Sequence, residues 1–301
     1  MRSVQHSLLA LAVAALGVTV AACNNDKNMA PQSPILSQAQ ADSLATTVVG
    51  DVVDEISTAT MDGSGGGGLA GTASIDAAAP LGSAAVPQCL PAKSPTPVVD
   101  SDNDGVPDSV RFDYAGCVIS LPLTIDSLSG TIDLIDPTPA TADHSVERVF
   151  TDFRRVAVRL ITGATSSVTD NGVRRASHDT TTLHSSETNF RTDFVGPKGG
   201  TSEHVRTWES LFTADVAGSI MRNAVLPSGT WSVNGTSSWT RGQHSNSLTV
   251  TTNPPLHYNA SCTAAPRFDA GKITAVVMRG TQTMTVAIEF TACGVYTVTR
   301  S

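Results

Sequence analysis

The sequence lacks the short motifs by which most hydrolases, metalloproteases and dithiol redox proteins are detected. It has no G-x-S-x-G, no H-E-x-x-H and no C-x-x-C, and its glycine-rich stretches carry no Lys-Ser/Thr of a phosphate-binding loop. No pair among the histidines that follow residue 22 has zinc-ligand spacing with a third ligand nearby. These absences predict a protein without a catalytic role.

Aromatic residues are also scarce, with three Trp, three Tyr and eight Phe in 301 residues. Carbohydrate-binding surfaces stack sugars on aromatic rings, and this content is thin for such a function. We therefore expect Trp208, Trp231 and Trp239 to pack in the core. Trp231 and Trp239 lie an even number of residues apart, so they could share one face of a sheet.

The chain opens with MRSVQHSLLALAVAALGVTVAAC, in which Arg2 precedes an apolar run from Leu8 to Val20. This run is too short to span a membrane and is typical of a secretory signal. Its last residues, Val20 to Cys23, resemble the lipobox of bacterial lipoproteins. The resemblance implies cleavage after residue 22 and acylation of Cys23, a stable anchor when several chains are attached. Asn24, rather than Asp, then predicts a cell-envelope location at the outer membrane.

The charge balance is acidic once the predicted signal peptide, residues 1–22, is removed. Loss of Arg2 leaves 18 basic and 27 acidic side chains, a net charge near −9. This excess disfavours nucleic acids and anionic lipid surfaces as partners. The predicted membrane contact is therefore the lipid anchor, and the sequence does not name a protein or small-molecule partner.

Four cysteines follow the predicted acylation site, and an even count in an exported chain predicts two disulfides. Three pairings are possible. We favour Cys89–Cys117 and Cys262–Cys293, because each pair is close in sequence. Free thiols are the alternative.

The remaining chain divides by composition. Residues 23–32 form a polar tether, and residues 33–61 carry apolar side chains at helical spacing, which predicts an amphipathic helix. The stripe comprises Leu44, Val48, Val49, Val52, Val53 and Ile56. The helix could begin at Ser33-Pro34 or at a capping box of Ser37 and Gln40. Residues 62–98, rich in Gly, Ala, Ser and Pro, predict a flexible linker.

Residues 99–301 alternate polar and apolar side chains between turn signals, which predicts an antiparallel β-domain. Ser129-Gly130, Asn171-Gly172 and Arg279-Gly280 are typical of hairpin turns, as is the stretch from Gly196 to Gly200. Strands between His178 and Glu209 have few aliphatic residues and should be solvated on at least one face. We predict a mainly β fold, an antiparallel meander forming a curved sheet or a sandwich, with the N-terminal helix packed on it.

The C-terminal part, from Leu226 to Val298, resembles a recurrent ending of β-rich envelope lipoproteins from environmental bacteria. The matching features are Gly-Thr-Trp at 229–231, the strand end between Tyr258 and Cys262, and the late Cys-Gly at 293–294. This resemblance implies a β-rich fold and brings no activity with it.

An acidic loop, VVDSDNDGVPDSVRF, runs from Val98 to Phe112. It resembles the D-x-D-x-D-G loops of EF-hands and of thrombospondin type 3 repeats. The resemblance implies calcium as the cofactor, because such loops surround the ion with hard oxygen ligands. The implied ligands are the carboxylates of Asp100, Asp102, Asp104 and Asp108 with the backbone carbonyl of Val106. Gly105 would permit the sharp turn.

The loop departs from that family at position 12, where Arg111 replaces the acidic residue that binds calcium through both oxygens. The missing ligand would have to come from elsewhere, and Asp113 is one candidate. The alternative is a solvated acidic turn held by Asx-type hydrogen bonds.

Three functions remain open. The first is a non-catalytic, lipid-anchored envelope lipoprotein with a binding or structural role. The second is a carrier or receptor for a lipid or other hydrophobic ligand, which requires an apolar sheet face beneath the helix. The third is an anchored hydrolase, which requires a buried His beside a Ser or a carboxylate pair.

Overall fold

The computed structural model describes residues 37–63, 91–120, 122–221 and 225–301, and only the backbone of residues 54–63. The predicted signal peptide, the tether and most of the predicted linker lie outside the described residues. Among the residues that are described, no helix combines the length and the apolar character needed to cross a bilayer.

The predicted amphipathic helix is present as α1 (Gln38–Gly63). It begins there because Ser37 and Gln40 form a capping box. The amide of Gln40 donates to Oγ of Ser37 at 3.2 Å, and the amide of Ser37 donates to Oε1 of Gln40 at 2.9 Å. The alternative cap of the prediction is therefore present, and Ser33 lies outside the described residues.

One face of α1 is buried in the larger of two apolar clusters. Its buried and half-buried members are Ala41, Leu44, Ala45, Val48, Val49, Val52 and Val53. Both alanines are fully buried although they were not part of the predicted stripe. Their short side chains let the helix backbone approach the sheet closely. Ile56, the last predicted member, lies outside the described side chains.

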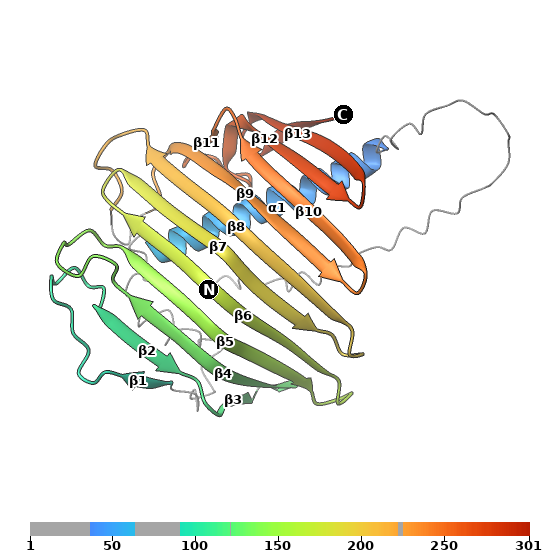
Figure 1. Cartoon of the computed structure of the whole chain (residues 1–301). Helices are drawn as coiled ribbons and strands as arrows, with labels where there is room; N and C mark the ends of the chain where they lie inside the picture. Colours follow the sequence, from blue (N-terminus) through green and yellow to red (C-terminus); the bar gives the residue numbers. More distant parts are fainter. Residues whose placement is uncertain (1–36, 64–90, 121, 222–224) are drawn as a thin grey trace. The chain divides into compact units, whose positions relative to one another are not determined.

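The described strands form one antiparallel sheet, shown with α1 in Figure 1. The strands are β1 (Ala92–Ser94), β2 (Ser109–Asp113), β3 (Cys117–Ser120), β4 (Thr124–Ile135), β5 (Val146–Arg159), β6 (Thr165–His178), β7 (Thr182–Val195), β8 (Thr201–Ala214), β9 (Gly229–Arg241), β10 (His244–Thr252), β11 (Leu256–Tyr258), β12 (Phe268–Arg279), β13 (Gln282–Ala292) and β14 (Val295–Arg300). Their order follows the chain, except that β3 pairs only with β4, and β11 pairs with β9 and β12.

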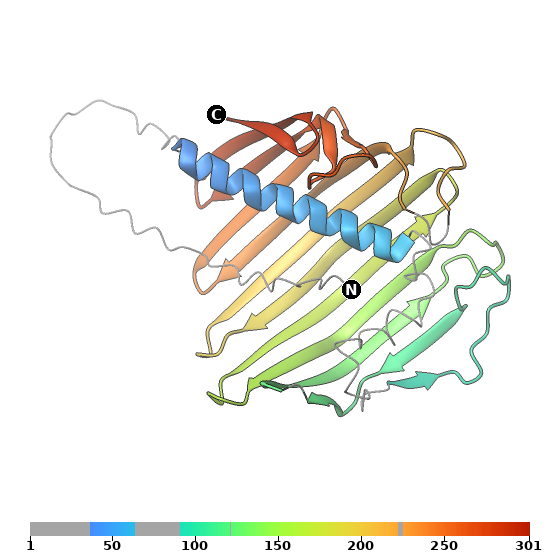
Figure 2. The same cartoon turned by 180° about the vertical axis from the view of Figure 1, so that it is seen from behind.

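Buried side chains cross this sheet in rows on a single face. Leu183, Phe212, Trp231 and Leu256 are successive cross-strand partners on β7, β8, β9 and β11, and all four are buried. Because side chains alternate along each strand, their neighbours point to the opposite, more polar face. α1 lies across the apolar face, as Figure 2 shows. The predicted fold class is confirmed as a mainly β antiparallel meander with the helix packed on it.

A second apolar cluster lies on the N-terminal strands. Its buried members are Val106, Val110, Phe112, Tyr114, Cys117, Ile132, Leu134, Val146 and Ala176. Val106 belongs to the acidic loop rather than to a strand, and it is only 3 % exposed. The loop is therefore fastened to the sheet by an apolar side chain at its centre.

Two predicted hairpin turns lie instead inside long strands. Gly130 of β4 and Gly172 of β6 lie opposite β-bulges in β5 and β7, with φ of 89° and 131°. A Cβ on Gly130 would stand 2.1 Å from the carbonyl oxygen of Asp152, and one on Gly172 would stand 2.9 Å from the Cα of Phe190. These glycines are needed for close backbone approach, so the predicted turns are wrong. The turns at 196–200 and 279–280 are confirmed.

The predicted linker boundary also changes, because the chain already forms the edge strand β1 within residues 62–98. β1 pairs with β2, and Lys93 is the cross-strand partner of Phe112. The acidic loop thus connects two paired strands and does not follow an unstructured segment directly.

A charged group interrupts the apolar face at its centre. The carboxylate of Glu187 on β7 lies 2.7 Å from Nε of Arg174 and 3.3 Å from Nε of Arg206. Its side chain is 4 % exposed, and each arginine side chain is about a quarter exposed. Arg174 also stacks over the ring of Phe190 at 4.1 Å. The two arginines are held together by one shared carboxylate.

Candidate metal centre

The acidic loop lies between β1 and β2 and closes on itself through backbone and side-chain contacts. The amide of Asp108 donates to the carbonyl of Val99 at 2.9 Å. The carboxylate of Asp108 in turn accepts from the amide of Ser101 at 2.7 Å and from its hydroxyl at 2.6 Å. These contacts from Ser101 lower the pKa of Asp108. Asp108 therefore joins the two ends of the loop.

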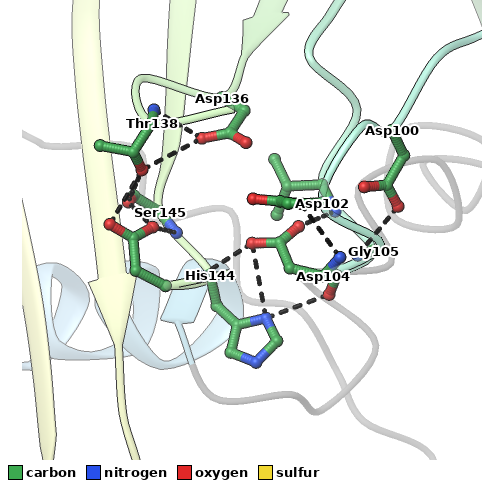
Figure 3. A network of polar contacts seen from close by, with 10 residues as sticks. Asp100, Asp102, Asp104, Gly105, Asp136, Thr138, His144 and Ser145 are labelled. Carbon is green, nitrogen blue, oxygen red and sulfur yellow. Dashed lines mark hydrogen bonds and ion pairs between the residues drawn. The ribbon is translucent and has the colours of Figure 1, made fainter. Parts of the chain in front are cut away.

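The structure brings three of the predicted ligands together. One carboxylate oxygen from each of Asp100, Asp102 and Asp104 lies within 4.8 Å of the others. The loop amides orient these groups, as shown in Figure 3. Gly105 donates to Asp100 at 3.1 Å, and the amide of Asp104 donates to Asp102 at 3.2 Å.

Two oxygens in this group are buried without a hydrogen-bond partner, namely Oδ1 of Asp100 and Oδ2 of Asp102. The side chain of Asp104 is fully buried, and its Oδ1 accepts from the amide of Val106 at 2.7 Å. Buried carboxylates at this spacing repel one another and lack water, unless a cation satisfies the free oxygens. Carboxylate oxygens in a turn are the ligands calcium prefers, so the residues present fit that ion.

The other predicted ligands are placed differently. Both oxygens of Asp108 are engaged by Ser101, and the structure does not bring them into the group of three. Val106 uses its amide to bind Asp104. Its role as a carbonyl ligand stays a prediction.

Asp136, at the end of β4, borders the acidic group and was not predicted from the sequence. It is 2 % exposed, and its Oδ2 is buried without a hydrogen-bond partner. Burial raises its pKa, and the carboxylates of Asp104 and Asp102 raise it further. No spacing rule connects it to the loop, because the pairing of β2 with β4 brings the two together.

His144 attaches the β4–β5 connection to the loop. Its amide donates to Oδ2 of Asp104 at 2.9 Å, and its Nδ1 lies 3.0 Å from the carbonyl oxygen of Asp104. The ring of His144 stacks on that of His178, with centroids 4.9 Å apart. The metal-ligand candidates are thus tied to β6 through two histidines.

A cavity of about 910 Å³ lies beside this attachment. Its walls mix apolar and polar side chains, including Val106, Val146, Ala176, His144, His178 and Ile220. Asp104 lines the same cavity, so the acidic group and the cavity share a wall.

The predicted disulfide between Cys262 and Cys293 is present, with Cα atoms 5.6 Å apart. It joins the segment after β11 to the turn between β13 and β14. Cys117 is buried in the N-terminal cluster. Its predicted partner Cys89, like the predicted acylation site Cys23, lies outside the described residues, so that pairing stays a prediction.

Two histidines bear on the hydrolase hypothesis. His257 lies between Asp269, at 2.6 Å from Nδ1, and Asp215, at 3.1 Å from Nε2. These partners raise its pKa and occupy both ring nitrogens. Burial, with Arg206 nearby, lowers the pKa of His204 to about 3. Both ring nitrogens of His257 therefore contact carboxylates, and the low pKa of His204 favours its neutral form near neutral pH.

The tryptophans largely follow the expected core packing. Trp208 and Trp231 are buried, and Nε1 of Trp231 donates to Oγ of Ser210 at 2.8 Å. Trp239 is half-buried and stacks on His204 with centroids 3.5 Å apart. Trp239 also stacks with Phe194 at a centroid separation of 5.9 Å, so three rings lie together at this place on the sheet.

No protein-family model matches the chain, and comparisons with curated proteins and with solved structures give no match either.

Proposed function

We propose that this chain is a non-catalytic lipoprotein of the cell envelope, lipid-anchored at Cys23, whose β-domain binds calcium at the acidic loop. The observation that carries the calcium proposal is the pair of buried, unpartnered oxygens on Asp100 and Asp102 beside Asp104. A cation at their centre would satisfy both oxygens and cancel the repulsion among the carboxylates. The ion's role is structural, because it fastens the loop that leads into β2.

Calcium is expected to raise the melting temperature of the protein. With a dissociation constant in the weak extracellular range, about 10⁻⁴–10⁻³ M, 10 mM calcium adds about 1.4–2.7 kcal/mol of stability. Asp102→Ala combined with Asp104→Ala should remove the shift, as measured by thermal unfolding with and without EGTA. Magnesium at the same concentration is the control. A wild-type melting temperature that ignores millimolar calcium would contradict the proposal.

The anchor has its own expected result. Cells grown with a clickable fatty-acid analogue should label the wild-type protein, and Cys23→Ser should abolish the labelling because it removes the acylated thiol. The same variant should move from the membrane fraction to the soluble fraction. Labelling that persists in Cys23→Ser would show that the lipobox resemblance does not describe this chain.

The structure supports the hypothesis of a carrier for a hydrophobic ligand less well than the proposed function. The sheet face beneath α1 is apolar, as that hypothesis requires, but Val48 and Val52 of the helix are themselves fully buried there. A hydrophobic ligand at that place would have to displace the helix. Saturable binding of a fluorescent fatty acid to the protein would reverse the order of the two hypotheses.

A further inference from the structure

The acidic loop has no carboxylate available at its twelfth position. Arg111 stands there and binds Asp133 through two hydrogen bonds of 2.6 and 2.8 Å. Asp113, the substitute considered from the sequence, lies on β2 and accepts from the amide of Ala115 at 2.9 Å. A calcium ion held by the loop alone would therefore lack its strongest ligand.

Asp136 is placed to supply that ligand. Ile135 is the cross-strand partner of Ser109, and the amide of Asp136 donates to the carbonyl of Asp108 at 3.2 Å. This pairing brings the end of β4 against the loop. In Figure 3 one oxygen of Asp136 is bound by Thr138, and the other faces Asp102.

The buried carboxylate of Asp136 also needs a positively charged or hydrogen-bonding partner for its free oxygen. The side chain is 2 % exposed, so water does not stabilise its charge, and Oδ2 has no donor. The carboxylates of Asp104 and Asp102 repel it. A buried carboxylate with one unsatisfied oxygen is destabilised by two neighbouring carboxylates. The same carboxylate is stabilised when it shares a divalent cation with them.

We propose that Asp136 is the fourth carboxylate ligand of the calcium ion, replacing the ligand lost at Arg111, so that the ion joins the 100–108 loop to the β4–β5 connection. This inference rests on the calcium proposal above. Asp136 borders the group of Asp100, Asp102 and Asp104 without belonging to the 4.8 Å set, so we expect its side chain to move towards the ion on binding.

The β4–β5 connection is already organised around this point. Thr138 and Ser145 both bind Asp143, and His144 binds Asp104. An ion shared by Asp104 and Asp136 would therefore fix both ends of the connection, at 136 and at 144. Since His144 and Asp143 line the 910 Å³ cavity, the ion would also fix one of its walls.

The test compares wild type with Asp136→Asn, using Asp143→Asn as the matched control from the same connection. Asp136→Asn should lower calcium affinity by at least about tenfold, measured by isothermal titration calorimetry. In EGTA the same variant should melt about 2–4 °C above wild type, because a repelled carboxylate has been made neutral. In 10 mM calcium it should melt below wild type. Asp143→Asn should keep wild-type affinity for calcium.

The outcomes separate the two proposals. If Asp136→Asn binds calcium as wild type does, while Asp102→Ala with Asp104→Ala does not, the loop binds calcium alone and the fourth-ligand proposal is overturned. If wild type gives no calcium response, the proposed function itself fails. If the Asp136→Asn variant does not fold, hydrogen exchange on the wild-type protein tests the same proposal without a substitution. Calcium should slow exchange at residues 137–145, and unchanged exchange there would also overturn the joining of the two segments.

Discussion

Replacing Glu187 with glutamine is expected to lower the free energy of unfolding by about 3 kcal/mol, because it leaves two guanidinium groups facing each other without their shared carboxylate. Glu187 is 4 % exposed and contacts Arg174 and Arg206 at 2.7 and 3.3 Å. Removing one partner of a buried pair costs about 3–5 kcal/mol. The arginine side chains are about a quarter exposed, which places this case at the lower end. Urea denaturation of the variant measures the loss.

Glu209→Gln is the matched control for this experiment. Glu209 also pairs with a basic side chain, His184 at 3.3 Å, but it is 71 % exposed. Exposed pairs contribute little, so the control should change stability by less than about 0.5 kcal/mol. Equal losses in Glu187→Gln and Glu209→Gln would show that the central charged group is solvated and does not support the sheet.

The double substitution Cys262→Ser with Cys293→Ser is expected to cost about 3–4 kcal/mol. The bond closes a loop with a sequence separation of 31 residues. In the chain-entropy model, opening such a loop increases the freedom of the unfolded chain by about that amount. The measurement is the urea midpoint of the double variant against wild type, both under oxidising conditions.

The neighbouring pair Thr263→Ser with Thr291→Ser serves as control, because both threonines are exposed and flank the disulfide. It should shift stability by less than about 0.5 kcal/mol. If the cysteine double variant behaves like this control, the segment after β11 is held by its other contacts, among them the hydrogen bond from Gly294 to the carbonyl of Phe268 at 2.9 Å.

The periodic features of the sequence predicted the fold well. Alternation identified the strands around Arg279-Gly280, and helical spacing identified the buried face of α1. Ala41 and Ala45 escaped prediction because alanine is common on both buried and exposed helix faces. Asn171-Gly172 was assigned to a turn because a turn and a β-bulge both require glycine at positive φ. The local sequence does not distinguish a turn from a β-bulge, because the difference depends on which neighbouring strand packs against the glycine.

Only those residues of the metal centre that are close together in the sequence could be predicted. The alternate aspartates at 100, 102 and 104 predicted the loop, and their carboxylate groups do lie close together in the structure. Asp136 follows Asp104 after three further strands, β2, β3 and β4. Its place depends on the register in which Ser109 opposes Ile135. A residue brought in by strand register leaves no spacing signature in the sequence.

The order of the strands has a consequence for how the chain reaches this structure. Most strands pair with the strand made just before them, so the sheet can grow by short loop closures as the polypeptide lengthens. α1 is made before every strand, yet its apolar cluster includes Val286 and Ile288 of β13, which are made near the end. α1 also packs against β6, β7 and β8, which are made earlier. Part of its apolar face therefore stays uncovered until the C-terminal strands exist, and during that interval this part is open to chaperones and to misassembly.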